Sequence, residues 1–293
     1  MSKKLKSLCA LICTAVLMLT MCVSAAGVFL EGANIRSLSH ESFDSVPIYL
    51  NGKYMCEAVK TGNTSYVSIN EFCEKMLNRS CSMRWDSGEV TLSIASGNVF
   101  LLLDLSRHVL LVNDRCLYLQ GGVYNIDGEV YVPVRPLAMA FAASLSWRSD
   151  EENCGIYLSR RSGDMIVSGN DFYNADDLYW LSRVIYAESG NQPLAGMIGV
   201  GNVVLNRVRD HSGSFPDSVY GVIFQPGQFS VVDNGTIYSQ PPEHCILAAK
   251  LCLEGFSTVG DSLFFLNPSI SSSLWFDNHR VFRLSIGEHY FYA

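Results

Sequence analysis

The chain has 293 residues, of which 48% are hydrophobic and only 17% are charged. This composition supplies enough apolar side chains for one large or two modest cores, and it excludes disorder for most of the chain. The formal net charge is −7. Nucleic acid is set aside as a partner, because proteins that bind it carry clustered lysines and arginines, whereas this chain is acidic.

Residues 1–26 have the pattern of a secretory signal peptide. A basic start at residues 1–6 precedes an apolar run at residues 8–23 and small residues at 24–26. An uncleaved anchor is the alternative, although the run is short for a spanning helix of ~20 residues. We therefore expect an exported protein, secreted or held in the cell envelope, with no stable membrane span after cleavage. Residues 27–44 show no clear period and are expected to be a linker.

Ten cysteines occur, and the seven that follow the signal cannot all pair because their number is odd. Cys245 and Cys252 fall on one predicted helix, where the rise per residue separates their Cα atoms by ~10 Å, too far for a disulfide. Most of these cysteines are expected to be small buried apolar residues. The sequence has no CxxC pattern, and we expect neither a metal nor another cofactor.

Residues 45–160 are predicted to form a small α+β module of short strands and two brief helices, organised by an internal repeat. An apolar strand at residues 46–53 runs into an Asn-Gly turn, and residues 108–115 repeat this pattern with an Asn-Asp turn. Both turns suit a hairpin. Residues 66–69 and 131–134 are likewise similar, and each is followed by a short helix and a strand that contains tryptophan.

The segment Tyr131-Val-Pro-Val-Arg-Pro136, together with Trp147, resembles the copper amine oxidase N-terminal-like domain of many exported cell-envelope proteins of Gram-positive bacteria. Copper is not expected here, because His108 is the one candidate imidazole ligand of this module and copper sites need several ligands. The resemblance implies a binding or spacing module that contacts the cell envelope.

Residues 161–171 are polar and contain Ser-Gly pairs, so they are expected to be a second linker. Residues 172–293 then read mainly as helices that end in strands, and the chain as a whole is predicted to be an α+β protein of two domains. Asn174 can cap a helix that runs to Glu188, with two aspartates placed favourably in its first turn.

The predicted helix carries a candidate general acid. At 100° per residue, Glu188 falls in the same arc as Leu181, Val184 and Ile185, so its carboxylate faces the core side. A carboxyl group in apolar surroundings has a raised pKa, which a general acid needs near neutral pH. The alternative is a glutamate at a helix end that points into solvent.

A second helix is predicted from Leu194 to about Arg207, with Pro193 at its first position. It contains three glycines, each costing about 1 kcal/mol relative to alanine, and we expect close packing against the first helix to compensate. They are Gly196, Gly199 and Gly201. Asn202 and Asn206, one turn apart, predict a polar stripe on this helix.

Five segments follow one another in the order of a known family. They are Val184-Ile-Tyr-Ala-Glu188, Gly199-Val-Gly-Asn-Val-Val-Leu-Asn-Arg207, Val222-Ile-Phe-Gln-Pro-Gly-Gln-Phe-Ser230, Leu263-Phe-Phe-Leu-Asn-Pro268 and Ile286-Gly-Glu-His-Tyr-Phe-Tyr292. Together they resemble the SleB/CwlJ-type cell-wall hydrolases, which are spore-cortex-lytic and related peptidoglycan enzymes. The resemblance implies a lysozyme-like catalytic domain that acts on glycan strands, with Glu188 at the position of the family's catalytic glutamate.

One position departs from the family pattern. Members usually carry a second glutamate four residues after the first, and here that position is Gln192. An essential carboxylate at this place would make the chain inactive, whereas a structural role would make the change harmless. We favour the structural role, because Gln192 still precedes Pro193 at a helix start.

The sequence places no acidic partner near Glu188, and the other acids of this domain are scattered. A route with one carboxylate therefore fits better than the usual pair. The expected reaction is lytic transglycosylation between N-acetylmuramic acid and N-acetylglucosamine, with hydrolysis by a muramidase as the alternative, and the spore cortex is a candidate substrate. The predicted substrate-binding residues lie in two family motifs that read as loops. They are Gln225, Gln228, Ser230 and Asn267, each of which could instead bond to nearby backbone.

Aromatic side chains could stack on sugar rings, although most are expected to pack in the core or at its rim. The candidates are Tyr186, Tyr238, Trp275 and Tyr290. His289 is interpreted as a structural histidine whose hydrogen bonds are satisfied, with a catalytic role as the alternative.

Three other functions stay open. An N-acetylmuramoyl-L-alanine amidase would need zinc ligands spaced as in His-Glu-x-x-His, which the histidines of this domain do not show. A cysteine peptidase would need a thiol beside a histidine, and Cys245 next to His244 is the one hint, although the two point different ways on a helix. A cell-wall-binding protein with an inactive catalytic fold is suggested by Gln192.

Overall fold

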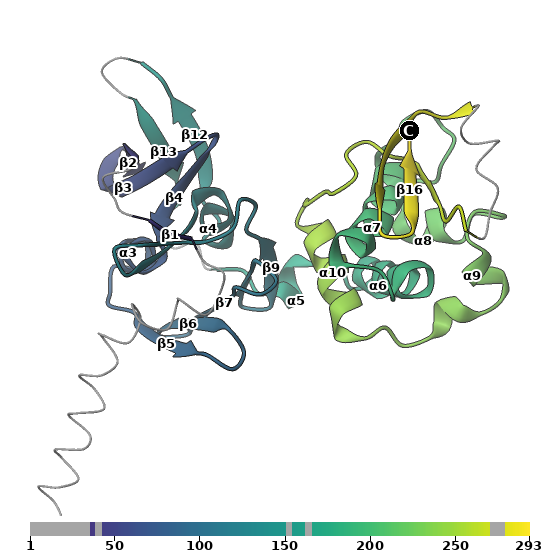
Figure 1. The fold of residues 1–293 in the computed structure, drawn as a ribbon, viewed down its shortest axis with the longest axis horizontal. Helices are drawn as coiled ribbons and strands as arrows, with labels where there is room; N and C mark the ends of the chain where they lie inside the picture. Colours follow the sequence, from purple (N-terminus) through teal and green to yellow (C-terminus); the bar gives the residue numbers. More distant parts are fainter. Residues whose placement is uncertain (1–35, 39–42, 151–153, 162–165, 270–278) are drawn as a thin grey trace, which may run out of the picture. The chain divides into compact units, whose positions relative to one another are not determined.

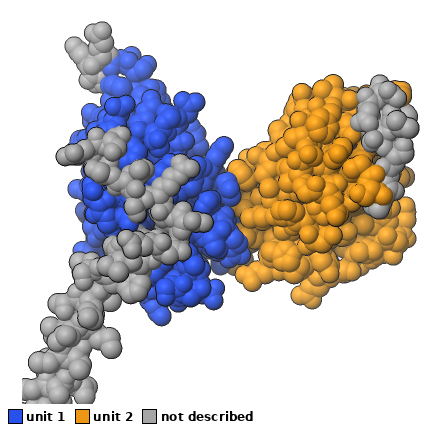
Figure 2. Space-filling view, in the orientation of Figure 1, with its two compact units in different colours: residues 1–167 blue, residues 168–293 orange. Residues whose placement is uncertain are grey.

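The computed structural model describes residues 36–38, 43–150, 154–161, 166–269 and 279–293. The predicted signal peptide lies outside these residues. The chain divides into two compact units, residues 1–167 and residues 168–293 (Figure 2). Each unit is described by itself below.

In its described residues, the first unit holds two sheets and two short helices. Its elements are β1 (Arg36–Leu38), β2 (Asp44–Leu50), β3 (Lys53–Thr61), β4 (Thr64–Ser68), α3 (Ile69–Leu77), β5 (Ser82–Asp86), β6 (Thr91–Ser96), β7 (Val99–Asp104), β8 (Val109–Val112), β9 (Arg115–Tyr118), β10 (Tyr124–Ile126), β11 (Glu129–Pro133), α4 (Val134–Ala140), β12 (Ser144–Arg148) and β13 (Gly155–Ser159). Strand β1, which pairs with β10 in parallel, and the first residue of β2, Asp44, fall within residues 27–44, where a linker is expected.

An eight-stranded sheet has the order β1-β10-β11-β4-β3-β2-β13-β12, and a five-stranded sheet runs from β5 to β9 in chain order. The core of this unit includes Phe72 of α3 and Phe141 after α4, whose ring centroids lie 5.8 Å apart. Strand β4 leads directly into α3, β11 leads directly into α4, and the two strands are antiparallel neighbours. The internal repeat stays a prediction.

Both predicted hairpins form. Strands β2 and β3 are joined at Asn51 and Gly52, with φ of 50° and 80°, and β8 and β9 are joined at Asn113 and Asp114, with φ of 46° and 68°. Two successive left-handed residues make the hairpin turn whose twist matches that of the strands, and asparagine, aspartate and glycine adopt this conformation most readily.

The second unit packs helices against one another and against a small sheet. Its elements are α5 (Gly169–Phe172), α6 (Ala175–Ser189), α7 (Leu194–Arg209), α8 (Val219–Ile223), α9 (Ser230–Asp233), the 3₁₀ helix η3 (Thr236–Tyr238), α10 (Glu243–Leu253), β14 (Phe264–Leu266), β15 (Phe282–Ile286) and β16 (His289–Tyr292). Helices α6, α7 and α10 contact one another, and the sheet β14-β16-β15 packs on α7 (Figure 1). The α+β class is therefore confirmed, while residues 169–171 of α5 fall within the expected second linker.

Close approach explains two glycines of α7. A Cβ on Gly201 would lie 2.9 Å from Ile185 of α6 and 2.7 Å from the Cys252 sulfur of α10, as predicted for packing between helices. A Cβ on Gly199 would instead meet Phe291 of β16 at 2.7 Å. The compensation expected from α6 alone therefore comes partly from the sheet. Pro193 is the N-cap of α7 and not its first helical residue.

Cys245 and Cys252 both lie on α10, buried and without a disulfide, as predicted. Burial raises the pKa of the Cys245 thiol to about 11 and that of Cys252 further still, so both thiols stay protonated. Across the described ranges, none of the helices has the length and hydropathy needed to cross a membrane.

Candidate active site

Helix α6 begins and ends as the sequence predicts. The Asn174 side-chain oxygen accepts hydrogen bonds from the backbone N–H groups of Asp176 and Asp177, both at 3.0 Å. These bonds satisfy two of the four amides that a helix start leaves without partners. The helix ends at Ser189, so Glu188 sits in its last turn.

Glu188 occupies the core side of α6. Leu181, Val184 and Ile185, which share its arc, are fully buried, and Glu188 itself is half-buried. This burial raises the pKa of the Glu188 carboxyl above its ordinary value, because the charged form loses hydration. The arrangement confirms that Glu188 faces the core side, and it suits a general acid.

Gln192 joins the turn after α6 to the turn between β15 and β16. Its backbone N–H donates to the Ser189 carbonyl at 2.9 Å, and its side-chain Oε1 accepts from the Glu288 backbone N–H at 2.9 Å. Its Nε2 donates to the Glu288 carboxylate at 3.2 Å. Gln192 is only 8% exposed. These contacts favour the structural role expected for this residue.

Asn267 reaches the same carboxylate. Its Nδ2 donates to Glu288 Oε2 at 3.2 Å, and its Oδ1 accepts from the Ser269 backbone N–H at 2.9 Å. Glu288 is one of the acids that are scattered along the sequence of this domain, and the structure brings it to the segment that follows Glu188. The Gly-Glu pair between two predicted strands was the available signal, because it marks a tight turn.

Two of the other predicted substrate residues, Gln225 and Gln228, have hydrogen-bond partners elsewhere in the unit. Gln225 Nε2 donates to the Ser214 carbonyl at 3.1 Å, and Gln228 Oε1 accepts from Arg207 at 3.2 Å. Ser230 is exposed and opens α9. None of the hydrogen bonds that the structure describes for these three residues leads to Glu188. Asn267, in contrast, shares the Glu288 carboxylate with Gln192.

Arg207 is a residue whose importance the sequence analysis missed. It is 5% exposed, its Nε donates to the Leu263 carbonyl at 2.7 Å, and burial lowers its pKa to about 10. Its guanidinium lies 4.9 Å from the ring centroid of Phe215 and 5.4 Å from those of Phe229 and Phe264. Arg207 thus ties the segment of Gln228 to the segment that enters β14.

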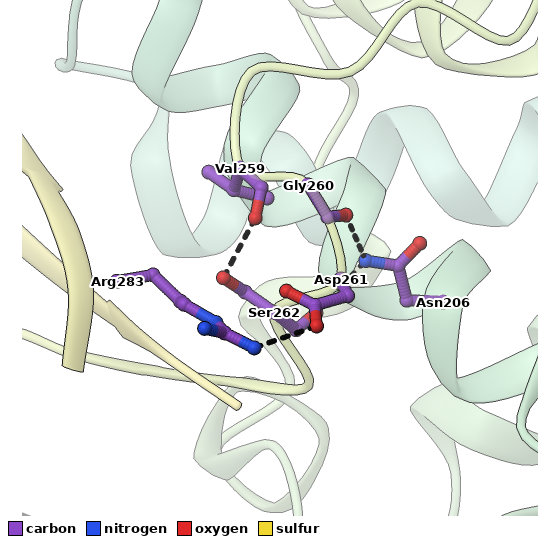
Figure 3. Close-up of polar contacts among 6 residues, drawn as sticks. All are labelled: Asn206, Val259, Gly260, Asp261, Ser262 and Arg283. Atoms are coloured by element: carbon purple, nitrogen blue, oxygen red, sulfur yellow. Dashed lines mark hydrogen bonds and ion pairs between the residues drawn. The ribbon is translucent and has the colours of Figure 1, made fainter. Parts of the chain in front are cut away.

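The predicted polar stripe on α7 binds the loop before β14 (Figure 3). Asn206 Nδ2 donates to the Gly260 carbonyl at 2.8 Å and to the Ser262 carbonyl at 2.9 Å. The Ser262 hydroxyl donates to the Val259 carbonyl at 2.7 Å. These bonds fix the shape of a loop that carries no regular structure of its own.

Asn202, one turn earlier on α7, holds the start of the same loop. Its Nδ2 donates to the Phe256 carbonyl at 2.9 Å, and its Oδ1 accepts from the Thr258 backbone N–H at 3.0 Å. On the outer side of the loop, Asp261 forms an ion pair with Arg283 of β15 at 2.7 Å (Figure 3). The stripe therefore has a structural role.

An aromatic cluster surrounds Trp180 on α6. The ring centroids of Tyr220, Phe224 and Tyr238 lie 5.5, 4.9 and 6.2 Å from that of Trp180. Tyr220 is 53% exposed and Tyr238 is 62% exposed, so the cluster offers ring surface to solvent. Of the other aromatics singled out in the sequence, Tyr186 and Tyr290 are partly exposed, and Trp275 lies outside the described residues.

His289 lies on β16 as expected and is buried against Phe265 and Phe291. Burial lowers its pKa and the nearby Glu288 charge opposes that shift. Its Nδ1 has no hydrogen-bond partner among the described residues, so the expectation of a satisfied histidine was wrong for this atom.

The two rival functions, an amidase and a cysteine peptidase, would need a metal site or a thiol beside a histidine. Nowhere in the described part of the chain do three His, Cys, Asp or Glu side chains gather in a group that could hold a metal ion. His244 is exposed, with Nε2 3.3 Å from the Gly190 carbonyl, while Cys245 is buried. The histidine and the thiol therefore point different ways, as predicted.

Two known families match the chain. Residues 191–292 match the Cell Wall Hydrolase family, and residues 49–156 match the Copper amine oxidase N-terminal domain. The first match begins three residues after Glu188, so the role of Glu188 stands on the helix geometry and on the motif around it.

Curated relatives match part of their length. A spore cortex-lytic enzyme of Bacillus cereus is 35% identical over 119 residues, which are 41% of this chain and 45% of that protein. The spore cortex-lytic enzyme of Oceanobacillus iheyensis is 32% identical over 119 residues, which are 41% of this chain and 42% of that protein. The chain thus covers less than half the length of these relatives.

Two solved structures are also similar. One is the catalytic domain of the germination-specific lytic transglycosylase SleB from Bacillus anthracis, with 36% identity and a TM-score of 0.38, covering 41% of this chain and 97% of that one. The other is the catalytic domain of the Bacillus cereus SleB protein, with 34% identity and a TM-score of 0.38, covering 45% of this chain and 100% of that one.

Proposed function

Because its C-terminal domain belongs to the cell wall hydrolase family, we propose that this chain is an exported enzyme that cleaves the glycan strands of peptidoglycan. The proposed reaction is lytic transglycosylation between N-acetylmuramic acid and N-acetylglucosamine, with Glu188 as the one catalytic carboxylate. The names of the relatives, spore cortex-lytic enzyme and germination-specific lytic transglycosylase, support the spore cortex as the substrate.

The observation that carries the proposal is the place of Glu188. The carboxyl group sits half-buried at the end of an apolar helix face, and burial raises its pKa. It therefore stays protonated at a higher pH than an exposed glutamate does, so it can donate a proton to a sugar oxygen.

The same group can complete both proton transfers. The Glu188 carboxyl gives its proton to the glycosidic oxygen as the bond from that oxygen to C1 of the muramyl residue breaks. The resulting carboxylate then takes the proton of the muramyl 6-hydroxyl while that oxygen bonds to C1. The products are a 1,6-anhydro-muramyl end and a free N-acetylglucosamine end, no water is consumed, and Glu188 returns to its protonated form.

Substrate binding is assigned to the surface around this helix end. Asn267, Gln225, Gln228 and Ser230 are proposed to lie along the glycan, with the Trp180 cluster as a platform on which a sugar ring can stack. The domain at residues 49–156 is proposed to hold the enzyme at the cell envelope. Residues 1–26 are proposed to direct export.

Product analysis tests this function. The protein without residues 1–26 is incubated with purified spore cortex and with vegetative peptidoglycan, and the released fragments are weighed by mass spectrometry. Anhydro-muramyl ends support the proposal, and their loss in Glu188→Gln assigns the acid. Glu89→Gln, which removes an exposed carboxylate in the first unit, is the matched control and retains activity.

The other outcomes exclude the proposal in different ways. Ordinary reducing ends indicate hydrolysis by water, and free stem peptides indicate an amidase. The absence of fragments from both substrates favours a cell-wall-binding protein with an inactive catalytic fold.

A further inference from the structure

We propose that Glu288 is a substrate-positioning residue, and that Gln192 and Asn267 hold its carboxylate in place for the glycan. This inference rests on the proposed function, because it assigns a contact to the same substrate. It also assigns to position 288 the carboxylate that position 192 lacks.

The Glu288 carboxylate is anchored on one side and free on the other. Oε2 accepts hydrogen bonds from Gln192 Nε2 and from Asn267 Nδ2, both at 3.2 Å. Within the described residues no donor bonds to Oε1, and the residue is exposed. An oriented carboxylate oxygen with free lone pairs can accept a hydrogen bond from a sugar hydroxyl or from the N–H of an N-acetyl group.

This carboxylate also lies next to the helix end that carries Glu188. The Gln192 backbone donates to the carbonyl of Ser189, the residue directly after Glu188, and the Gln192 side chain bonds Glu288 at both its backbone and its carboxylate. Three segments, at residues 189–192, 267 and 288, therefore meet at the turn that directly follows helix α6.

The contacts explain why an amide stands at position 192. Oε1 of Gln192 accepts from the Glu288 N–H while Nε2 donates to the Glu288 carboxylate, and an amide offers both an acceptor and a donor. A glutamate at position 192 would bring two carboxylates to about the same 3.2 Å separation, where one of them must take up a proton. Positions 192 and 288 can therefore hold one ionised carboxylate between them, and not two.

The exchange of the two side chains is the test. Four proteins are compared, namely the wild type, Glu288→Gln, Gln192→Glu and the double variant Gln192→Glu/Glu288→Gln, with Glu89→Gln as the control. KM and kcat are measured on soluble glycan strands, and the melting temperature is measured at neutral and acidic pH.

We expect Glu288→Gln to keep the melting temperature of the wild type, since two amides can still bond, and to raise KM about tenfold with a smaller change in kcat. Gln192→Glu should have a lower melting temperature than the wild type at neutral pH. In acid its melting temperature should return to that of the wild type, because the two carboxyl groups then share a proton. At neutral pH the double variant should recover the melting temperature of the wild type, because it again pairs one amide with one carboxylate.

Two results would overturn the inference alone. The first is an active wild type with unchanged KM in Glu288→Gln. The second is a double variant whose shift in melting temperature from the wild type equals the sum of the shifts of the two single variants. That additivity would mean that the two side chains are not coupled. A wild type that releases no glycan fragment is different, because it removes the proposed function itself and the positioning role with it.

Discussion

The guanidinium of Arg207 donates to the Leu263 carbonyl at 2.7 Å and to Gln228 Oε1 at 3.2 Å, so one buried side chain connects two loops of the second unit. The surrounding rings of Phe215, Phe229 and Phe264 exclude water from the cation. The buried guanidinium thus holds the segment of Leu263 and the segment of Gln228 in a fixed arrangement.

Replacing Arg207 should destabilise this domain. Arg207→Met leaves the Leu263 carbonyl without its donor, and we expect a loss of about 1–3 kcal/mol in the free energy of unfolding. Arg207→Lys keeps the charge but not the planar fork, so it should recover only part of the loss. Urea unfolding measures both. Arg209→Met, on the exposed side of the same helix, is the control, and an equal loss there would contradict the role of Arg207.

Glu188→Gln should make the protein more stable at neutral pH while it abolishes cleavage. Because burial raises the pKa of Glu188, the native state binds this proton more tightly than the unfolded state does. Stability is therefore lost as the pH rises from the ordinary glutamate pKa, about 4.3, through the raised value. The variant removes that loss. Its melting temperature should exceed that of the wild type at neutral pH and match it in acid, and a lower value at neutral pH would argue against a buried acid.

The rate of cleavage should fall as the pH rises through the raised pKa of Glu188, because only the protonated carboxyl can donate to the glycosidic oxygen. The measurement is kcat/KM on soluble glycan strands over the acidic and neutral range, at a pH where the protein stays folded. A rate that instead increases with pH across this range would assign Glu188 the part of a general base.

Gly201→Ala should destabilise the protein by about 1–3 kcal/mol, because a new methyl group would press on Ile185 and Cys252 in a packed interior. Gly196→Ala, on the same helix, meets its nearest neighbour at 3.3 Å and gains helix propensity, so its change should be near zero. Thermal unfolding of the two variants compares them directly. Equal effects would mean that packing at Gly201 does not decide the outcome.

Chelation should leave activity unchanged, because the proposed route needs only the proton of Glu188. The released fragments are measured before and after EDTA is added, and again after zinc is added in excess of the EDTA. A marked loss with EDTA that zinc reverses would revive the amidase as the function of this domain.

Much of the fold follows from local pattern. Asn174 and the apolar arc through Ile185 predict α6 correctly, and the turn residues Asn51-Gly52 predict a hairpin that forms. Strand β1 and helix α5 were missed because they are only three and four residues long, too short to show a period. The α+β class was predicted correctly for the same reason that α6 was, since long periodic segments carry the strongest signal.

The site was harder to predict. Gln192 and Glu288 are 96 residues apart in the sequence, and no local pattern reports a contact over that distance. Glu188 could be proposed because the helix period places it beside apolar neighbours and because the motif around it resembles that of a known family. The partners of Arg207 likewise depend on how separate loops come together, which follows from tertiary packing.

Residues 256–262 of the loop between α10 and β14 are bound to α7 by two uncharged side-chain amides, with Asn202 bonding Phe256 and Thr258 and Asn206 bonding Gly260 and Ser262. A charged side chain of α7 that also bonds this loop is Arg207, which is buried and contacts Leu263 at the end of the loop. Hydrogen bonds between neutral groups are not screened by ions and do not titrate. The Asp261–Arg283 pair on the outer side is 70% and 40% exposed and weakens in concentrated salt. The wall of the domain beside β14 should therefore keep its shape when ionic strength changes, and salt dependence of binding can be attributed to the glycan contacts themselves.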